Sequence, residues 1–289
     1  MYFRCVFLLL AVAVARSAFP QNIRRITHRD GLSNSSILSL AQDADGYIWA
    51  GSCDGLNLWD GNSARNFRFS GNLIQEIVAT DDGYLWVRTN YGVDRFDTRD
   101  RRIEMLAGFQ RVYKFAARSR DEAFFLHGNK LYGYVASKGA FEPVDVRGAE
   151  LTGVLRMCLD GDGALWLVRS GDIRCAQVAY DADGRASVGE WERMTMPDGV
   201  VFTRYDGDRT IFFTDRNGML FRFDTEQRRA FPIFDLREEL GRRGALSSVI
   251  SDKDDYVLAF GMSGVLRLRS TDPIEGRYEL QAVSYTHLT

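Results

Sequence analysis

The sequence predicts an all-β protein, a β-propeller built from four-stranded blades of about 40 residues. The first observation is a recurring motif of an Asp-Gly turn and two short apolar strands, seen first at residues 43–60 (DADGYIWAGSCDGLNLWD). Asp-Gly is a strong hairpin signal because both central residues of a type I′ turn need positive φ. The second observation is the spacing: six copies begin near residues 45, 82, 121, 162, 208 and 254, at intervals of 37 (82 − 45) to 46 (254 − 208) residues. Such a period with four short strands per copy is typical of propeller blades.

Each copy divides into four expected strands. The first strand precedes the turn, so we expect blades to start near residues 37, 75, 112, 154, 201 and 246. The second strand is apolar on both faces (YIWA, YLWV, ALWL), as expected for a strand between two neighbouring blades. The third strand alternates apolar and polar residues, and the fourth is weaker, for example Phe67–Phe69 and Trp191–Met194. We expect the propeller to cover residues 19–282.

Composition excludes one class of partner. The chain of 289 residues has 37 Lys and Arg against 39 Asp and Glu, a net charge of −2, and no basic run. Nucleic acid is therefore not an expected partner.

The N-terminal residues predict export. Arg4 precedes an apolar run over Val6–Val14, and small residues suited to signal-peptide cleavage follow. We expect a secretory signal peptide over residues 1–18 and a periplasmic mature chain.

Three cysteines remain after residue 18, namely Cys53, Cys158 and Cys175. Cys158 and Cys175 fall on the first and third strands of one copy, about 9–10 Å apart across two strand spacings. That separation exceeds disulfide range, so we predict no disulfide.

The two ends of the chain suggest how the ring closes. Residues 22–28 (NIRRITH) are expected to form a strand of fourth-strand character, which would close the ring. Residues 277–283 look like a fourth strand of the sixth blade, so we expect a truncated seven-bladed ring with six blades present. Residues 283–289 resemble translated read-through of a sequencing-library adaptor and are expected to be a non-native tail, with a C-terminal strand as the alternative.

The residues 31–61 (GLSNSSILSLAQDADGYIWAGSCDGLNLWDG) carry a family resemblance. The Gly31-Leu32-Ser33 start, the Asp45-Gly46-x-x-Trp49 element and the Trp59-Asp60-Gly61 end resemble the two-component regulator propeller repeat. That repeat builds the periplasmic sensors of hybrid two-component systems in Bacteroidetes. The resemblance covers residues 23–269 and weakens in copies three, five and six.

The resemblance implies a longer receptor. In the family, two propellers precede an immunoglobulin-like domain, a membrane helix, a histidine kinase and further modules, so this part would be inner-membrane anchored through its C-terminal continuation. It implies sensing of a small-molecule or oligosaccharide ligand, often a glycan fragment, with no catalysis in this part. The implied partners are the downstream domains and a homodimeric copy.

The Asp-rich turns at residues 43–46, 160–163 and 181–184 invite a calcium interpretation. They lack the further ligands and the Glu at position twelve of an EF-hand loop, and turn chemistry alone explains Asp beside Gly. We expect no metal and no cofactor. Trp49, Trp86 and Trp166 recur at one blade position, which favours packing between blades over sugar stacking.

Residues for catalysis are few, and we expect no catalytic site. His28, His127 and His287 are the only histidines, and the carboxylates show no singled-out pair. A free periplasmic enzyme, either a glycan hydrolase or a lyase of the streptogramin type with His127 on the rim, is the alternative. A protein-interaction scaffold also stays open, because a fold does not dictate a function.

Ligand binding is expected on the loops between second and third strands, which share one face of a propeller with the loops between blades. These loops bring together polar side chains, one aromatic ring and two cations. The predicted ligand-binding residues are Asp54, Tyr91, His127, Arg169 and Arg216.

Overall fold

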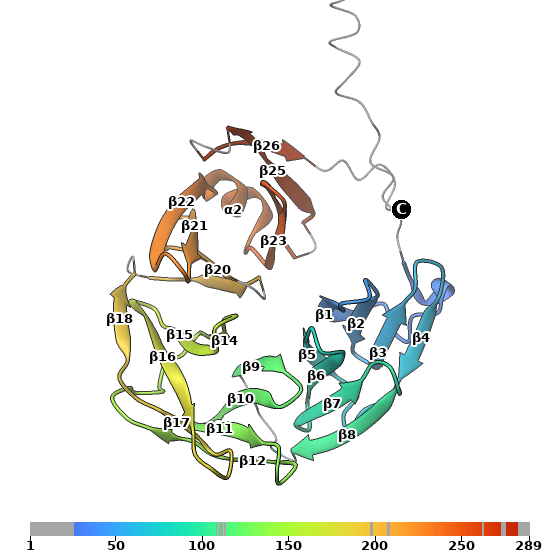
Figure 1. The fold of residues 1–289 in the computed structure, drawn as a ribbon. Helices are drawn as coiled ribbons and strands as arrows, with labels where there is room; N and C mark the ends of the chain where they lie inside the picture. Colours follow the sequence, from blue (N-terminus) through green and yellow to red (C-terminus); the bar gives the residue numbers. More distant parts are fainter. Residues whose placement is uncertain are drawn as a thin grey trace, which may run out of the picture. The chain divides into compact units, whose positions relative to one another are not determined.

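The computed structural model describes residues 26–282 except 108, 110, 111, 113, 197, 198, 207, 208, 262 and 273–275. The described residues fold into six sheets that follow one another around a central channel, with antiparallel pairing throughout except for one parallel pair in blade four (Figure 1). This confirms the prediction of an all-β propeller with six four-stranded blades. The signal peptide over 1–18 and the tail over 283–289 lie outside the described residues.

The strands of each blade run outward from the channel in chain order. The first strands are β1 (Ile37–Gln42), β5 (Ile74–Ala79), β9 (Lys114–Ser119), β14 (Arg156–Leu159), β19 (Phe202–Tyr205) and β23 (Ser248–Asp252). The second strands are β2 (Ile48–Ser52), β6 (Tyr84–Thr89), β10 (Glu122–His127), β15 (Ala164–Val168), β20 (Thr210–Thr214) and β24 (Asp255–Ala259). The third strands are β3 (Gly55–Trp59), β7 (Val93–Asp97), β11 (Lys130–Val135), β16 (Asp172–Tyr180), β21 (Met219–Asp224) and β25 (Val265–Asp272). The fourth strands are β4 (Ala64–Phe67), β8 (Arg102–Ala107), β12 (Ala140–Pro143), β18 (Glu192–Thr195), β22 (Arg229–Asp235) and β26 (Arg277–Ala282).

Blade four carries an extension that the sequence did not predict. Its third strand β16 is long enough to pair with β18 through residues 172–175 and with β17 (Ala186–Val188) through residues 178–180. Strand β17 pairs in parallel with β13 (Asp145–Val146), which belongs to the connection from blade three. The extension therefore ties the outer edges of blades three and four together.

Two short helices lie outside the blades. The 3-10 helix η2 (His28–Asp30) is capped by Thr27, whose hydroxyl accepts from the Arg29 amide at 3.2 Å. The helix α2 (Arg237–Arg243) occupies the connection between blades five and six. Neither of these described helices is long and apolar enough to cross a membrane.

Two strand predictions differ from the structure. Residues 22–25 of the expected closing strand lie outside the described residues, and His28 begins a helix rather than a strand. The fourth strand of blade one is β4 (Ala64–Phe67) instead of 67–69. The Asp60 carboxylate accepts from the Ser63 amide at 2.8 Å, which closes a tight turn and starts the strand earlier.

Apolar clusters between consecutive blades form the core. Trp49, Trp86 and Trp166 are each about 99% or more buried, and each packs against the next blade. The packing interpretation of these tryptophans is therefore confirmed. The Trp49 ring, for example, meets Phe96 of blade two edge-on, with centroids 5.3 Å apart.

Leu40 on β1 and Ile250 on β23 are exceptions to this packing. They are 55% and 54% exposed. Leu40 of blade one and Ile77 of blade two occupy equivalent positions. Leu40 pairs with the residue after Trp49, and Ile77 pairs with the residue after Trp86. The equivalent Ile77 is only 7% exposed because blade one covers it. Blades one and six thus each leave one apolar side uncovered within the described residues.

Candidate functional site

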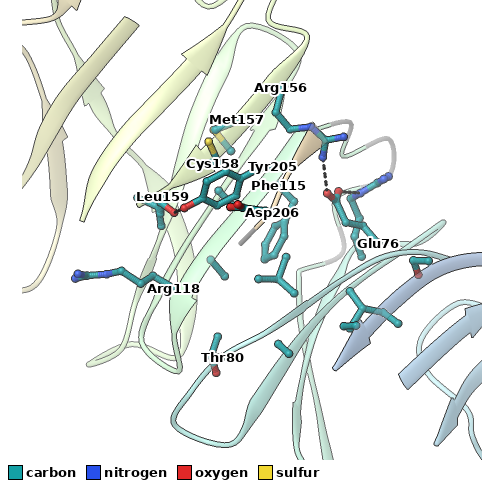
Figure 2. A pocket seen from close by; sticks show the side chains of 18 of the residues that line it. Glu76, Thr80, Phe115, Arg118, Arg156, Met157, Cys158, Leu159, Tyr205 and Asp206 are labelled. Atoms are coloured by element: carbon teal, nitrogen blue, oxygen red, sulfur yellow. Dashed lines mark hydrogen bonds and ion pairs between the residues drawn. The ribbon is translucent and has the colours of Figure 1, made fainter. Parts of the chain in front are cut away.

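A cavity of about 590 Å³ occupies the central channel (Figure 2). The first strands of blades one to five line it, together with Arg88 from the second strand of blade two. A first strand of a propeller contributes to this channel by position, so its side chains converge from several blades. The cavity is within the size range of small-molecule sites, which is about 300–1,000 Å³.

Three charged residues enter the channel at the same position of successive blades. Glu76, Lys114 and Arg156 each pair with the residue two places after the large aromatic side chain of the second strand. These aromatic residues are Trp86, Phe124 and Trp166. The blade repeat therefore places the three charges at one level of the channel.

An ion-pair network spans this level. The Glu76 carboxylate lies 3.0 Å from Arg88 Nε within blade two and 3.2 Å from Arg156 Nη1 of blade four. Arg156 also donates to the Thr203 carbonyl of blade five at 3.3 Å, and Arg88 donates to the Val112 carbonyl at 3.0 Å. Figure 2 shows Arg156 and Glu76 joined across the cavity.

The side chains of Lys114 and Arg204 lie near this network without a hydrogen-bond or ion-pair partner among the described residues, and both residues line the cavity. Burial lowers the pKa of Lys114, and the charges of Arg156 and Arg88 lower it further, whereas Glu76 opposes them. Burial likewise lowers the pKa of Arg204, and the Arg156 charge adds to the effect. Four cations therefore surround one carboxylate, and we call these five residues the channel cluster: Glu76, Arg88, Lys114, Arg156 and Arg204.

The other end of the cavity is built from groups that hold the fold. Asp160 accepts the indole N–H of Trp166 at 2.6 Å, and Tyr205 donates its hydroxyl to the Leu159 carbonyl at 2.9 Å. Arg118 pairs with Glu122 and donates to the Gly161 carbonyl at 2.8 Å. These groups are engaged with protein partners and leave the channel cluster as the better candidate.

Four of the ligand-binding residues predicted from the sequence lie in the loops after the second strands, and the fifth, His127, is the last residue of a second strand and not a loop residue. Asp54 is exposed, and its amide donates to Ser52 Oγ at 3.1 Å. Tyr91 is 52% exposed. His127 ends β10, and its ring packs near Phe109 and Tyr132, with centroids 5.4 and 6.5 Å apart.

The two predicted cations are also in such loops. Arg169 donates to the Glu150 carbonyl at 3.3 Å, and Arg216 is exposed and lies over Gly199. None of the five residues predicted from the sequence lines the central cavity. Their role as a binding site stays a prediction.

The channel cluster was missed by the sequence reasoning, although a signal was present. The signal is a charged residue in each of three expected first strands: Glu76 in IQEIVA, Lys114 in KFAARS and Arg156 in RMCL. A charge on the innermost strand of a propeller has no outer surface to reach, so it points to the channel.

The Asp-rich turns are held by hydrogen bonds of the chain itself. Asp43 Oδ1 accepts from the amides of Asp45 and Tyr47 at 3.1 and 2.9 Å. Asp160 Oδ1 accepts from Asp162 and Ala164 at 3.1 and 2.9 Å in the same way. Within the described residues, no group of three His, Cys, Asp or Glu side chains is placed to hold a metal ion.

Comparison with protein families finds one match. Residues 31–54 match the profile of the two component regulator propeller. The matched segment includes strands β1 and β2 and the turn that joins them.

Among curated proteins, a 62-residue segment, 22% of this chain, is 37% identical to histidine kinase P4 of Formosa agariphila. The segment spans 4% of that kinase's length.

Solved structures share the fold at low identity. The extracellular domain of the putative hybrid two component system BT3049 from B. thetaiotaomicron is 15% identical with a TM-score of 0.59, covering 90% of this chain and 36% of that one. Virginiamycin B lyase from Staphylococcus aureus is 13% identical with a TM-score of 0.63, covering 87% and 85%. PorZ, a surface component of the type-IX secretion system of Porphyromonas gingivalis, is 13% identical with a TM-score of 0.63, covering 89% of this chain and 33% of that one. The resemblance to the two-component regulator propeller repeat is thereby confirmed over residues 31–54.

Proposed function

We propose that this chain is the extracytoplasmic ligand-sensing propeller of a hybrid two-component sensor kinase, without catalysis in this part. The observation that carries the proposal is the repeat match over residues 31–54. The similarity to the extracellular domain of BT3049 and the short match to a histidine kinase support it. The expected signal peptide over residues 1–18 supports a periplasmic location.

The central cavity supports ligand binding by this part. It is concave, bounded by strands of five blades, and holds polar groups without a full set of partners. We propose that an oligosaccharide fragment or a comparable small molecule enters here, and that its binding changes the spacing of the blades. Further domains of the same receptor would carry that change to the kinase.

The uncovered sides of blades one and six support a further blade. Leu40 and Ile250 are exposed on the first strands of their blades, whereas apolar residues of other first strands are buried against a neighbouring blade. A seventh blade between β1 and β23 would bury both side chains and close the ring.

A propeller enzyme is the alternative function, because virginiamycin B lyase shares the fold. The sequence offers His127 as its acid–base residue. In the structure, His127 packs near Phe109 and Tyr132 and does not line the cavity. The sensing proposal is therefore the better supported of the two.

Two experiments test the proposal: sequencing of the gene beyond codon 289, and a reporter of the transcription that the intact receptor controls. We expect sequencing beyond codon 289 to reveal a membrane helix and a histidine kinase. We also expect transcription controlled by the intact receptor to respond to one member of an oligosaccharide panel. A stop codon shortly after one more blade would overturn the proposal and make turnover assays with His127→Ala the next step.

A further inference from the structure

We propose that Lys114, Arg156 and Arg204 bind an anionic group of the channel ligand, a carboxylate or a sulfate of an acidic sugar. The inference rests on the proposed sensing function, since it names the class of ligand for the same cavity.

The first support is the charge balance of the channel cluster. Glu76 is the one carboxylate of the cluster, although Asp81, Asp160 and Asp206 also line the cavity. Arg88 and Arg156 both pair with Glu76. Lys114 and Arg204 are left without a carboxylate partner among the described residues. Partly buried cations that lack a counter-charge are costly, and an incoming anion relieves that cost.

The second support is a pair of unsatisfied polar atoms. Arg156 Nε and Thr203 Oγ1 are buried and have no hydrogen-bond partner within the described structure. They lie on neighbouring blades, where Arg156 also contacts the Thr203 carbonyl. Buried donors are nearly always satisfied in proteins, and Arg156 lines the cavity, so its free Nε marks a place for an oxygen acceptor there.

The third support is the kind of contact that these side chains can make. A guanidinium presents a planar fork that matches carboxylate and sulfate oxygens, and an ammonium adds a point charge. Burial and the Arg156 charge lower the pKa of Lys114 and Arg204, and a bound anion would counter the repulsion from Arg156. The cavity of about 590 Å³ leaves room for a sugar ring attached to the anionic group.

The test is titration calorimetry on the full chain at constant ionic strength, with sodium glucuronate, sodium sulfate and glucose as probes. Lys114→Met and Arg204→Met each remove a cation at similar side-chain length. Arg118→Met is the matched control, because Arg118 lines the opposite end of the same cavity and pairs with Glu122. Circular dichroism and thermal melting show that each variant is folded.

We expect glucuronate or sulfate to bind, Lys114→Met and Arg204→Met each to weaken binding about ten-fold or more, and Arg118→Met to leave it nearly unchanged. Binding of glucuronate alone would assign a carboxylate, and binding of sulfate alone a sulfate ester. Equal loss in all three variants, or no binding of either anion, would overturn the inference. A reporter response to a neutral oligosaccharide in that case would leave the sensing function standing and remove only the anionic ligand.

Discussion

The indole Nε1 of Trp166 donates a 2.6 Å hydrogen bond to Asp160 Oδ2, and Trp49 donates to Asp43 in the same way at 2.7 Å. In both blades the other carboxylate oxygen accepts two backbone amides of the Asp-Gly turn. One Asp thereby joins the turn of a blade to the Trp that packs against the next blade. Blade two has Thr80 at this place, and its Trp86 donates instead to the Ser119 carbonyl of blade three at 2.8 Å.

Asp160→Ala should lower the free energy of unfolding by about 2–4 kcal/mol, because it leaves the buried Trp166 N–H and two turn amides without their acceptor. Urea unfolding at neutral pH measures the change. Asp181→Ala is the matched control: Asp181 caps a similar turn at 2.8–2.9 Å but is exposed and bonds no Trp. Equal losses in the two variants would contradict a special role for the Asp160–Trp166 bond.

Asp94→Asn should change how stability depends on pH. Burial raises the pKa of Asp94 even though Ser70 donates to its carboxylate at 2.6 Å. The native carboxyl then holds its proton to higher pH than the unfolded one, so its contribution to stability falls as pH rises from about 4 through the native pKa.

The Asn variant lacks this loss and should gain stability relative to the native chain over that pH range. Blade one shows that the fold accepts the amide, because Asn57 is buried at the equivalent position and its Oδ1 accepts from Ser33. Urea unfolding between pH 4 and 7 gives the difference. A difference that stays constant with pH would show that Asp94 does not titrate in this range.

Ile77→Ala should cost about 2–5 kcal/mol, because Ile77 is buried between blades one and two. Leu40→Ala, at the equivalent position of blade one, should change stability by less than about 0.5 kcal/mol in this chain, because Leu40 is 55% exposed. Chemical denaturation of both variants makes the comparison. A cost for Leu40→Ala close to that for Ile77→Ala would mean that another surface covers Leu40.

The three described cysteines should differ in reactivity toward a thiol reagent. Cys158 on β14 and Cys175 on β16 are both buried. Strand β15 lies between these two strands, and each cysteine is the register partner of Trp166 on that strand. Burial raises the pKa of both thiols, so the reactive thiolate is scarce in the folded chain. Mass spectrometry should find Cys53 labelled first and the other two only after denaturant is added; early labelling of Cys158 would contradict this burial.

Glu76→Gln should raise the affinity for anions about ten-fold, because it removes the carboxylate that competes for Arg88 and Arg156. Calorimetry with sulfate or glucuronate measures the gain. Glu104→Gln is a matched control. Glu104, on the fourth strand of the same blade, pairs with Arg95 on the third strand at 2.6 Å, and it does not line the cavity. A loss of anion affinity in Glu76→Gln would mean that Glu76 positions the arginines for the ligand.

The fold could be predicted because its signals are local. A turn followed by an apolar second strand recurs in each copy, with Asp-Gly in copies one, two and four, and Trp49, Trp86 and Trp166 all lie where this pattern predicts packing. The extension of blade four was not predictable, since β17 pairs in parallel with β13 from the preceding connection. The channel cluster was not predictable for a similar reason: the ion pair between blades two and four joins Glu76 and Arg156, two residues that lie 80 positions apart in sequence.

Anomalous diffraction from crystals of the chain soaked in selenate tests the central claim most directly, because selenium marks the place of a bound anion. The account predicts a peak inside the channel, within hydrogen-bonding distance of Lys114, Arg156 and Arg204. An empty channel with peaks beside the loop residues Arg169 and Arg216 would contradict it, and would place the anion on the face that the sequence first suggested.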